Sequence, residues 1–129
     1  LFTRDAVWQG KGRYEGAFGG YRGRAAIVAM IESYCVPSAH FAMTGHFFSA
    51  EAIHVDGESA TGEWMMLQCS TYAEGSSDLR SAALTLGFAF EDGAWRIADF
   101  ATRNIFSRRG GRWSDAERIP VPPLQGTDK

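Results

Sequence analysis

Two Asp-Gly dipeptides, each set between long runs of β-branched and aromatic residues, constrain this chain more than any other feature. They occur at Asp56-Gly57 and Asp92-Gly93. Between such runs, Asp-Gly favours a tight hairpin turn, because both residues tolerate the positive φ that the turn requires. The sequence therefore predicts an antiparallel meander of strands over the second half of the chain.

The runs on either side of these turns define the expected elements. We predict strands over residues 6–9, 40–55 (with a bulge or bend near 45–51), 59–72, 79–91 and 95–106, and a glycine-rich loop over 10–23. Residues 24–34 are predicted to form the helix, because five apolar residues recur there at helical spacing and Pro37 follows. Their stripe consists of Ala26, Ile27, Met30, Ile31 and Tyr34.

One helix followed by long antiparallel strands is an α+β arrangement, with the helix packed on one face of the sheet. Strands longer than ten residues need coiling and bulges to pack on a single helix. We therefore expect a strongly curved sheet wrapped around the helix. Its cone-shaped interior is a natural ligand site.

Composition excludes several classes of partner. The net charge of -2 provides no broad basic field, so nucleic acid is not expected to bind. No apolar run approaches the ~20 residues that cross a membrane. The two cysteines, Cys35 and Cys69, form no disulfide or metal motif and are predicted to be reduced, buried thiols of a cytoplasmic protein. The chain begins at Leu1 as if inside an element, so we expect that an upstream segment is missing.

Alternation along the strands sorts their side chains into two faces. His40, Ala42 and Thr44 share one face of the first meander strand. In the later strands the corresponding sets are Trp64, Met66, Gln68 and Ser70, then Ala82, Leu84, Leu86 and Phe88, then Ala98, Phe100, Thr102 and Asn104. Both faces are fairly apolar, so periodicity alone does not identify the pocket wall.

His40 is the candidate general base, because histidine titrates near neutrality and a strand end beside a cavity suits a base. From the residues alone, a histidine bonded to backbone at a strand end is the commoner case. His46 falls in the expected bend, and His54 next to a turn is expected to be solvated. No spacing fits a metal site.

Other catalytic groups are weaker candidates. A Cys69–His40 nucleophilic pair is conceivable, but cysteines in an apolar strand are usually small core residues. Glu63 and Asp99 alternate with pocket-facing positions and so are expected to point away. The remaining carboxylates considered are Asp5 and Glu15.

The order of several short motifs resembles the SnoaL-like branch of the nuclear-transport-factor-2-like superfamily. They extend over nearly all of residues 1–106 and are Asp5-Ala6-Val7-Trp8, Gly12-Arg13-Tyr14-Glu15-Gly16, His40-Phe41, Val55-Asp56-Gly57, Thr61-Gly62-Glu63-Trp64 and Glu91-Asp92-Gly93-Ala94-Trp95-Arg96-Ile97. The resemblance implies a cone-shaped α+β barrel with a deep pocket, forming a homodimer or homotrimer. It also implies chemistry without a cofactor or a metal, as in scytalone dehydratase, bile-acid dehydratase, hexachlorocyclohexane dehydrochlorinase, ketosteroid isomerases and polyketide cyclases.

The resemblance also assigns site residues. In the dehydratase and dehydrochlorinase members, a histidine at the start of the strand after the helices is the base, paired with an aspartate on an N-terminal helix. His40 falls on that histidine, and the helix would lie upstream of Leu1. By analogy the pocket is lined by Trp8, Ile31, Tyr34, Cys35, His40, Trp64, Met66, Leu84 and Phe100, with Gln68 and Asn104 as polar groups.

Two functions follow as expectations. The first is a cofactor-independent lyase, dehydratase or isomerase acting on a small hydrophobic molecule, with Tyr34 or Gln68 polarising an oxygen. The second is a non-catalytic ligand-binding or structural subunit. The domain is predicted over residues 1–106, its N-terminal helix apparently missing, and residues 107–129 are predicted to be a proline-containing tail that packs on the domain or on a partner subunit.

Overall fold

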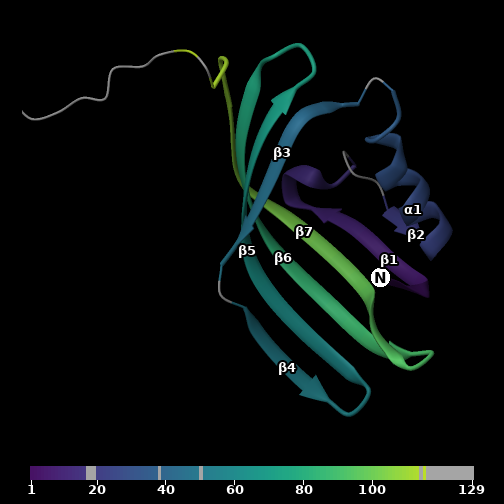
Figure 1. Cartoon of the computed structure of the whole chain (residues 1–129). Helices are drawn as coiled ribbons and strands as arrows, with labels where there is room; N and C mark the ends of the chain where they lie inside the picture. Colours follow the sequence, from purple (N-terminus) through teal and green to yellow (C-terminus); the bar gives the residue numbers. More distant parts are fainter. Residues whose placement is uncertain (17–19, 38, 50, 114, 116–129) are drawn as a thin grey trace, which may run out of the picture.

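A single curved sheet and one helix make up the fold of this protein (Figure 1). The computed structural model describes residues 1–16, 20–37, 39–49, 51–113 and 115. The elements in chain order are β1 (Phe2–Lys11), the short 3-10 helix η1 (Gly12–Tyr14), β2 (Gly20–Arg22), α1 (Arg24–Ser33), β3 (Phe41–Phe48), β4 (Ala52–Asp56), β5 (Ser59–Tyr72), β6 (Ser77–Glu91) and β7 (Ala94–Gly110). The predicted α+β class with a curved antiparallel sheet is confirmed.

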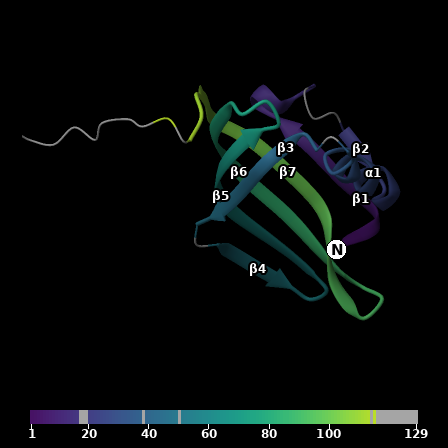
Figure 2. The ribbon, with the colours of Figure 1, turned by 45° about the horizontal axis from the view of Figure 1, so that its top comes forward.

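The sheet has the strand order β2-β1-β7-β6-β5-β3, and β4 pairs with β5 beside β3. Strands β5, β6 and β7 form the predicted antiparallel meander. The parallel pairing of β1 with β7 brings Trp8 next to Phe100 and joins the two ends of the domain. Figures 1 and 2 show α1, β1 and β2 gathered at one side of the curved sheet, with β4 at its far end.

Both Asp-Gly dipeptides lie at hairpin turns, although the turns differ. Between β6 and β7 the two-residue loop is Asp92-Gly93, and both residues have positive φ, at 52° and 76°. Between β4 and β5 the loop is Gly57-Glu58, and of these two residues only Gly57 has a positive φ. These turns fix the register of β4 against β5 and of β6 against β7, because a two-residue loop favours one pairing of its flanking strands.

The helix rests on β1 through one fully buried side chain. Ile27 is 0% exposed and packs with Phe2 and Ala6. Of the predicted apolar stripe, only Ile27 is buried, while Ile31 and Tyr34 remain exposed. A second core cluster of Tyr14, Ala82 and Leu84 lies inside the curve of the sheet. The two clusters leave the surface between α1 and the sheet open for a cavity.

Several predicted boundaries are corrected by the structure. Residues 40–55 form two strands rather than one, because the chain leaves the ladder between Phe48 and Ala52. The register shift in β3 lies between Phe41 and Met43 rather than in the expected segment 45–51. Strand β7 continues to Gly110, past the boundary predicted at 106. Most of the predicted tail, including its prolines, lies outside the described residues.

Candidate functional site

A cavity of about 600 Å³ lies on the concave side of the sheet. Its size falls within the range of roughly 300–1,000 Å³ that is typical of small-molecule sites. All the sequence-predicted site residues except Asn104 line it, namely Trp8, Ile31, Tyr34, Cys35, His40, Trp64, Met66, Gln68, Leu84 and Phe100. The sequence did not select the other lining residues, which are Tyr14, Met30, Phe41, Thr44, His46, Phe48, Tyr72, Arg80, Leu86 and Thr102.

Alternation along three neighbouring strands builds the cavity wall. Every second residue of β5 from Trp64 to Gln68 faces it, and the register places Trp64 beside Leu84 of β6. Leu84 in turn pairs with Thr102 of β7. The cavity wall is therefore a continuous, mainly apolar surface that crosses the sheet, with Gln68 and Thr102 as polar members.

A stacked aromatic pair forms one part of this wall. The rings of Trp8 and Phe100 lie 3.9 Å apart with an interplanar angle of 15°. The parallel pairing of β1 with β7 places them side by side. Within the described chain, the indole Nε1 of Trp8 is buried without a hydrogen-bond partner. A ligand packed here contacts flat apolar surface.

His40 lies between α1 and β3, at the wall of the cavity. Its backbone N–H donates to the carbonyl of Tyr34 at 3.3 Å, which holds the residue at the end of the helix turn. Its ring packs edge-on against the rings of Tyr34, Phe41 and Tyr72. Neither ring nitrogen has a hydrogen-bond partner among the residues that the structure describes. The imidazole is therefore positioned by ring contacts and keeps both nitrogens available.

Next to His40 lies a polar cluster that sequence reasoning missed, consisting of Tyr72, Asp78 and Arg80. Asp78 Oδ2 accepts from the Tyr72 hydroxyl at 2.6 Å and from Arg80 Nε at 2.7 Å, and Arg80 Nη2 donates to the Tyr72 oxygen at 2.8 Å. Asp78 is 2% exposed, and Arg80 is 29% exposed. We refer to these three residues as the polar cluster.

The start of β6 was predicted two residues too late, which left Asp78 outside the strand. The predicted strand began at residue 79, whereas β6 begins at Ser77. Extending the alternation of Leu84 and Leu86 backward along the strand places Asp78 and Arg80 on the same face. A charged pair on an otherwise apolar face would then have marked the polar end of the cavity.

Burial and charge shift the pKa values of this cluster. Burial, together with the hydrogen bond to Asp78, raises the pKa of Tyr72 above its ordinary value. Burial lowers the pKa of Arg80, but the hydrogen bond and the negative charge of Asp78 outweigh this effect and raise it. Tyr72 therefore remains a neutral donor and Arg80 a cation at neutral pH.

Gln68 and Asn104 were predicted to be polar groups of the pocket, and the structure places them differently. Gln68 lines the cavity, and its Nε2 donates to Ser70 Oγ at 2.8 Å. Asn104 is buried behind the wall, where its Nδ2 donates to the Tyr14 hydroxyl at 3.1 Å and to the Phe106 carbonyl at 3.0 Å. Asn104 thus supports a lining residue rather than lining the cavity itself.

The remaining candidate residues are the other two histidines and the two cysteines. His46 pairs in register with Gln68 within β3 and lines the cavity, so its expected place in a bend is wrong. His54 is exposed on β4, as expected. Both cysteines are free, but Cys35 is exposed rather than buried, and Cys69 is half-buried. Among the described residues, no group of three or more His, Cys, Asp or Glu side chains is placed to hold a metal ion.

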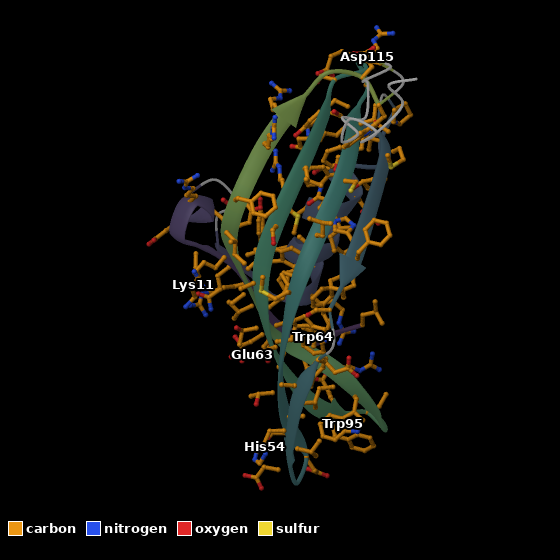
Figure 3. The ribbon with its side chains drawn as sticks, turned by 90° about the vertical axis from the view of Figure 1, so that its left-hand side faces the viewer. Lys11, His54, Glu63, Trp64, Trp95 and Asp115 are labelled. Carbon is orange, nitrogen blue, oxygen red and sulfur yellow. The ribbon has the colours of Figure 1, made fainter. Side chains whose placement is uncertain are left out.

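A second hollow of about 520 Å³ lies on the outer face of the sheet, the face away from the cavity. Its floor contains Ala83, Thr85 and Ala101, and its borders carry Lys11 and Arg103 together with Glu51 and Glu63. Figure 3 views the sheet from the side away from α1 and labels Lys11 and Glu63 there, with His54 and Trp95 near one end of the strands and Asp115 at the other. Glu63 therefore points away from the cavity, as the alternation predicted.

A curved α+β sheet that encloses an apolar cavity beside one helix defines the class of protein. The chain belongs to the SnoaL-like domain family, whose model matches residues 1–101. The resemblance to the SnoaL-like branch is thereby confirmed. No curated protein sequence matches the chain.

Solved structures share the fold. A hexachlorocyclohexane dehydrochlorinase from Novosphingobium barchaimii is 19% identical, with a TM-score of 0.70 over 94% of this chain and 77% of its own. A protein described as a putative scytalone dehydratase from Novosphingobium aromaticivorans is 20% identical, with a TM-score of 0.70 over 91% and 78%. An NTF2-like protein with a cystatin-like fold, also from Novosphingobium aromaticivorans, is 21% identical, with a TM-score of 0.63 over 81% and 64%.

At these identities the comparisons establish the fold and not the reaction. The structural neighbours include a dehydrochlorinase and a protein described as a dehydratase. In the described part of the chain, no helix is long and apolar enough to cross a membrane.

Proposed function

We propose that this protein is a cofactor-independent lyase, dehydratase or isomerase that acts on a small hydrophobic molecule of aromatic, polyketide, steroid or terpenoid type. The cavity supports a ligand of this kind, because its wall is largely apolar and aromatic, while His40, Tyr72 and Arg80 lie together on one part of it. His40 is the general base in this proposal. The family and the named activities of two structural neighbours favour a reaction of this class.

The observation that carries the proposal is the state of the His40 side chain. The residue is exposed, but its ring contacts the rings of Tyr34, Phe41 and Tyr72, and these contacts define its orientation. Its two nitrogens have no hydrogen-bond partner in the described residues, so a ligand in the cavity can present a C–H bond to one of them. A positioned imidazole suits proton removal from a bound ligand.

The roles expected for Tyr34 and Gln68 can be ranked by their contacts. Gln68 Nε2 already donates to Ser70 Oγ, so polarising a ligand oxygen would require it to give up that bond. The Tyr34 hydroxyl has no hydrogen-bond partner among the described residues and lies at the cavity. Tyr34 is therefore the more available donor of the two.

The test is the His40→Ala variant, with His54→Ala as the matched control on the exposed strand β4. Turnover is screened on hexachlorocyclohexane, hydroxylated naphthalenones and unsaturated ketosteroids, and then measured for both variants on the best substrate. His40→Ala should lower turnover by about 10²–10⁴-fold and leave ligand binding in place. Retention of turnover in His40→Ala would show that the proposed mechanism is wrong.

A non-catalytic binding or structural subunit is the second candidate. It is favoured by the absence, among the described residues, of a carboxylate hydrogen-bonded to His40 that would orient the base. Under this alternative, calorimetry would detect ligand binding in the native protein and in His40→Ala alike, and no screened compound would be turned over.

The proposal includes self-association into a homodimer or homotrimer through the outer face of the sheet. Met43, Phe47, Met65 and Leu67 are exposed on β3 and β5. Contiguous exposed apolar side chains of this kind are typical of protein contact surfaces. Cationic and carboxylate side chains both border the adjoining hollow. Two copies that meet through this face could therefore form ion pairs in both directions.

A further inference from the structure

The polar cluster holds the guanidinium of Arg80 in position but accepts only some of its N–H groups. Nε–H donates to Asp78, and one N–H of Nη2 donates to Tyr72. A guanidinium carries five N–H donors, so three remain. Within the described chain these three have no acceptor, and Arg80 lines the cavity. The side chain therefore presents fixed cationic donors at the polar end of an apolar cavity.

The neighbouring carboxylate of Asp78 determines how Arg80 can interact with a ligand oxygen. Asp78 is nearly fully buried and neutralises the charge of Arg80 at 2.7 Å. Because the pair has no net charge, Arg80 acts on a ligand through fixed hydrogen-bond donors and not through a net positive charge. An oxygen that gains negative charge in the cavity, in a reacting carbonyl or in a phenol that ionises, is stabilised by donors that are already fixed in place.

The base and these donors lie at the same end of the cavity. The ring of His40 contacts the ring of Tyr72 at 5.4 Å between centroids, and Arg80 contacts the hydroxyl of that same tyrosine. Tyr72 itself donates its proton to Asp78, so Arg80 is the member of the cluster with free donors. A small cyclic molecule can thus place a C–H bond at His40 and an oxygen at Arg80.

We propose that Arg80 is a catalytic residue that stabilises an enolate oxygen, and that the substrate is a cyclic carbonyl compound whose proton is removed from the carbon next to the carbonyl. This inference rests on the proposed function of His40 and deepens it. It replaces Tyr34 and Gln68 as the main groups that polarise the oxygen.

The chemical step balances without another reactant. His40 takes the proton, and the electron pair of the C–H bond moves through the new C=C bond onto the carbonyl oxygen, which Arg80 holds as an enolate. In an isomerisation, the imidazolium returns the proton to a different carbon and the carbonyl re-forms. In a dehydration, the enolate re-forms the carbonyl, expels the hydroxyl group from the next carbon, and the imidazolium proton converts it to water.

The inference is tested by binding of oxyanion analogues, which needs no turnover. Phenol, the two naphthols and nitrophenol are bound in turn, and their absorbance reports the ionised fraction as pH is varied. The chain offers a matched pair of variants, Arg80→Gln in the cavity and Arg109→Gln outside it. Arg109 lies 5.1 Å from the Tyr72 ring on an exposed side chain, and does not line the cavity.

The ionisation constant of the best-bound phenol should be higher in the native protein than in water, and about tenfold or more higher than in Arg80→Gln, since hydrogen bonds to charged groups have this strength. Arg109→Gln should match the native protein. Equal ionisation in Arg80→Gln and the native protein would overturn the proposal, and so would failure of every phenol to bind.

Folding and the role of His40 are controlled separately. If Arg80→Gln unfolds because Asp78 is left unpaired, Asp78→Asn/Arg80→Gln removes both charges together and carries the same expectation. His40→Ala should keep the phenol effect while losing turnover. Retained turnover in His40→Ala with a normal Arg80 effect overturns the proposed base alone, whereas the reverse pattern overturns Arg80 alone.

Discussion

The imidazole of His40 packs edge-on against the ring of Tyr72, with centroids 5.4 Å apart and an interplanar angle of 88°. His40 precedes β3, and Tyr72 is the last residue of β5. The same tyrosine donates its hydroxyl proton to the buried Asp78. Tyr72 therefore joins the candidate base to the polar cluster, through its ring on one side and its hydroxyl on the other.

Replacing Tyr72 with Phe separates these two contacts. The ring contact to His40 is retained, while Asp78 and Arg80 each lose a hydrogen bond. Because Asp78 is buried, Tyr72→Phe should lower the free energy of unfolding by about 1–3 kcal/mol, measured by urea titration. Tyr34→Phe is the control, since the Tyr34 hydroxyl has no partner in the described residues, and it should be close to neutral. Equal effects of the two variants would contradict the role assigned to the Tyr72 hydroxyl.

The raised pKa of Tyr72 makes stability depend on pH in the alkaline range. Burial and the hydrogen bond to Asp78 raise the pKa above 10.0, so above that pH the unfolded chain releases the proton more readily than the folded one. The stabilisation is complete below about pH 10 and is lost as pH rises through the folded value. The gap in unfolding free energy between the native protein and Tyr72→Phe should therefore narrow from about pH 10 upward. Urea titrations at several pH values measure it, and a constant or widening gap would refute this account.

The strands of the meander were predictable from sequence, because turn dipeptides and side-chain alternation depend on residues that are close together in the chain. A two-residue turn and strict alternation determined the strand Ser59–Tyr72, whose bounds agree with the prediction. Alternation grouped Trp64 with Met66 on one face, but the family resemblance was needed to assign that face, together with Leu84, to the pocket. The family resemblance, rather than the pattern, supplied His40 as the candidate base.

Non-local features were not predictable in this way. The parallel pairing of β1 with β7 joins residues that lie far apart in the sequence, and no turn chemistry encodes it. Asp78 was missed because the strand was predicted to begin at residue 79, although β6 begins at Ser77. Arg80 lay inside the predicted strand, and its charge on an otherwise apolar face was overlooked. His46 was assigned to a bend, since Gly45 beside it suggested an interruption that the register of β3 does not show.

Gly10 lies where β1 passes close to η1, and only a glycine fits there. A Cβ at this position would overlap the backbone oxygen of Tyr14. Gly10→Ala should therefore displace Tyr14 from its hydrogen bond with Asn104 and destabilise the protein by about 1–3 kcal/mol. Gly20→Ala on β2 is the matched control, because nothing lies within 4 Å of its Cβ position. Thermal and urea unfolding compare the two, and equal stability would show that β1 can shift away from η1.

The apolar side chains on the outer face predict that charge placed there disrupts self-association. Phe47 is 62% exposed on β3, whereas Trp95 is 46% exposed near the far end of the strands (Figure 3). By light scattering coupled to size exclusion, Phe47→Glu should reduce the native homodimer or homotrimer to a monomer, while Trp95→Glu should not. A monomeric native protein, or an unchanged mass in Phe47→Glu, would contradict the proposed contact surface.

The charges around the outer hollow allow a sharper test of the same surface. For a homodimer with a two-fold contact, we expect Glu63 of one copy to face Lys11 or Arg103 of the other, with the reverse contact following by symmetry. Glu63→Lys alone should weaken association, because it sets like charges against Lys11 and Arg103. Adding Lys11→Glu to the same chain restores opposite charges and should recover part of the lost affinity, with a salt dependence like that of the native protein. Sedimentation equilibrium at two salt concentrations measures both effects, and additive losses in the double variant would show that Lys11 and Glu63 do not face each other across the contact.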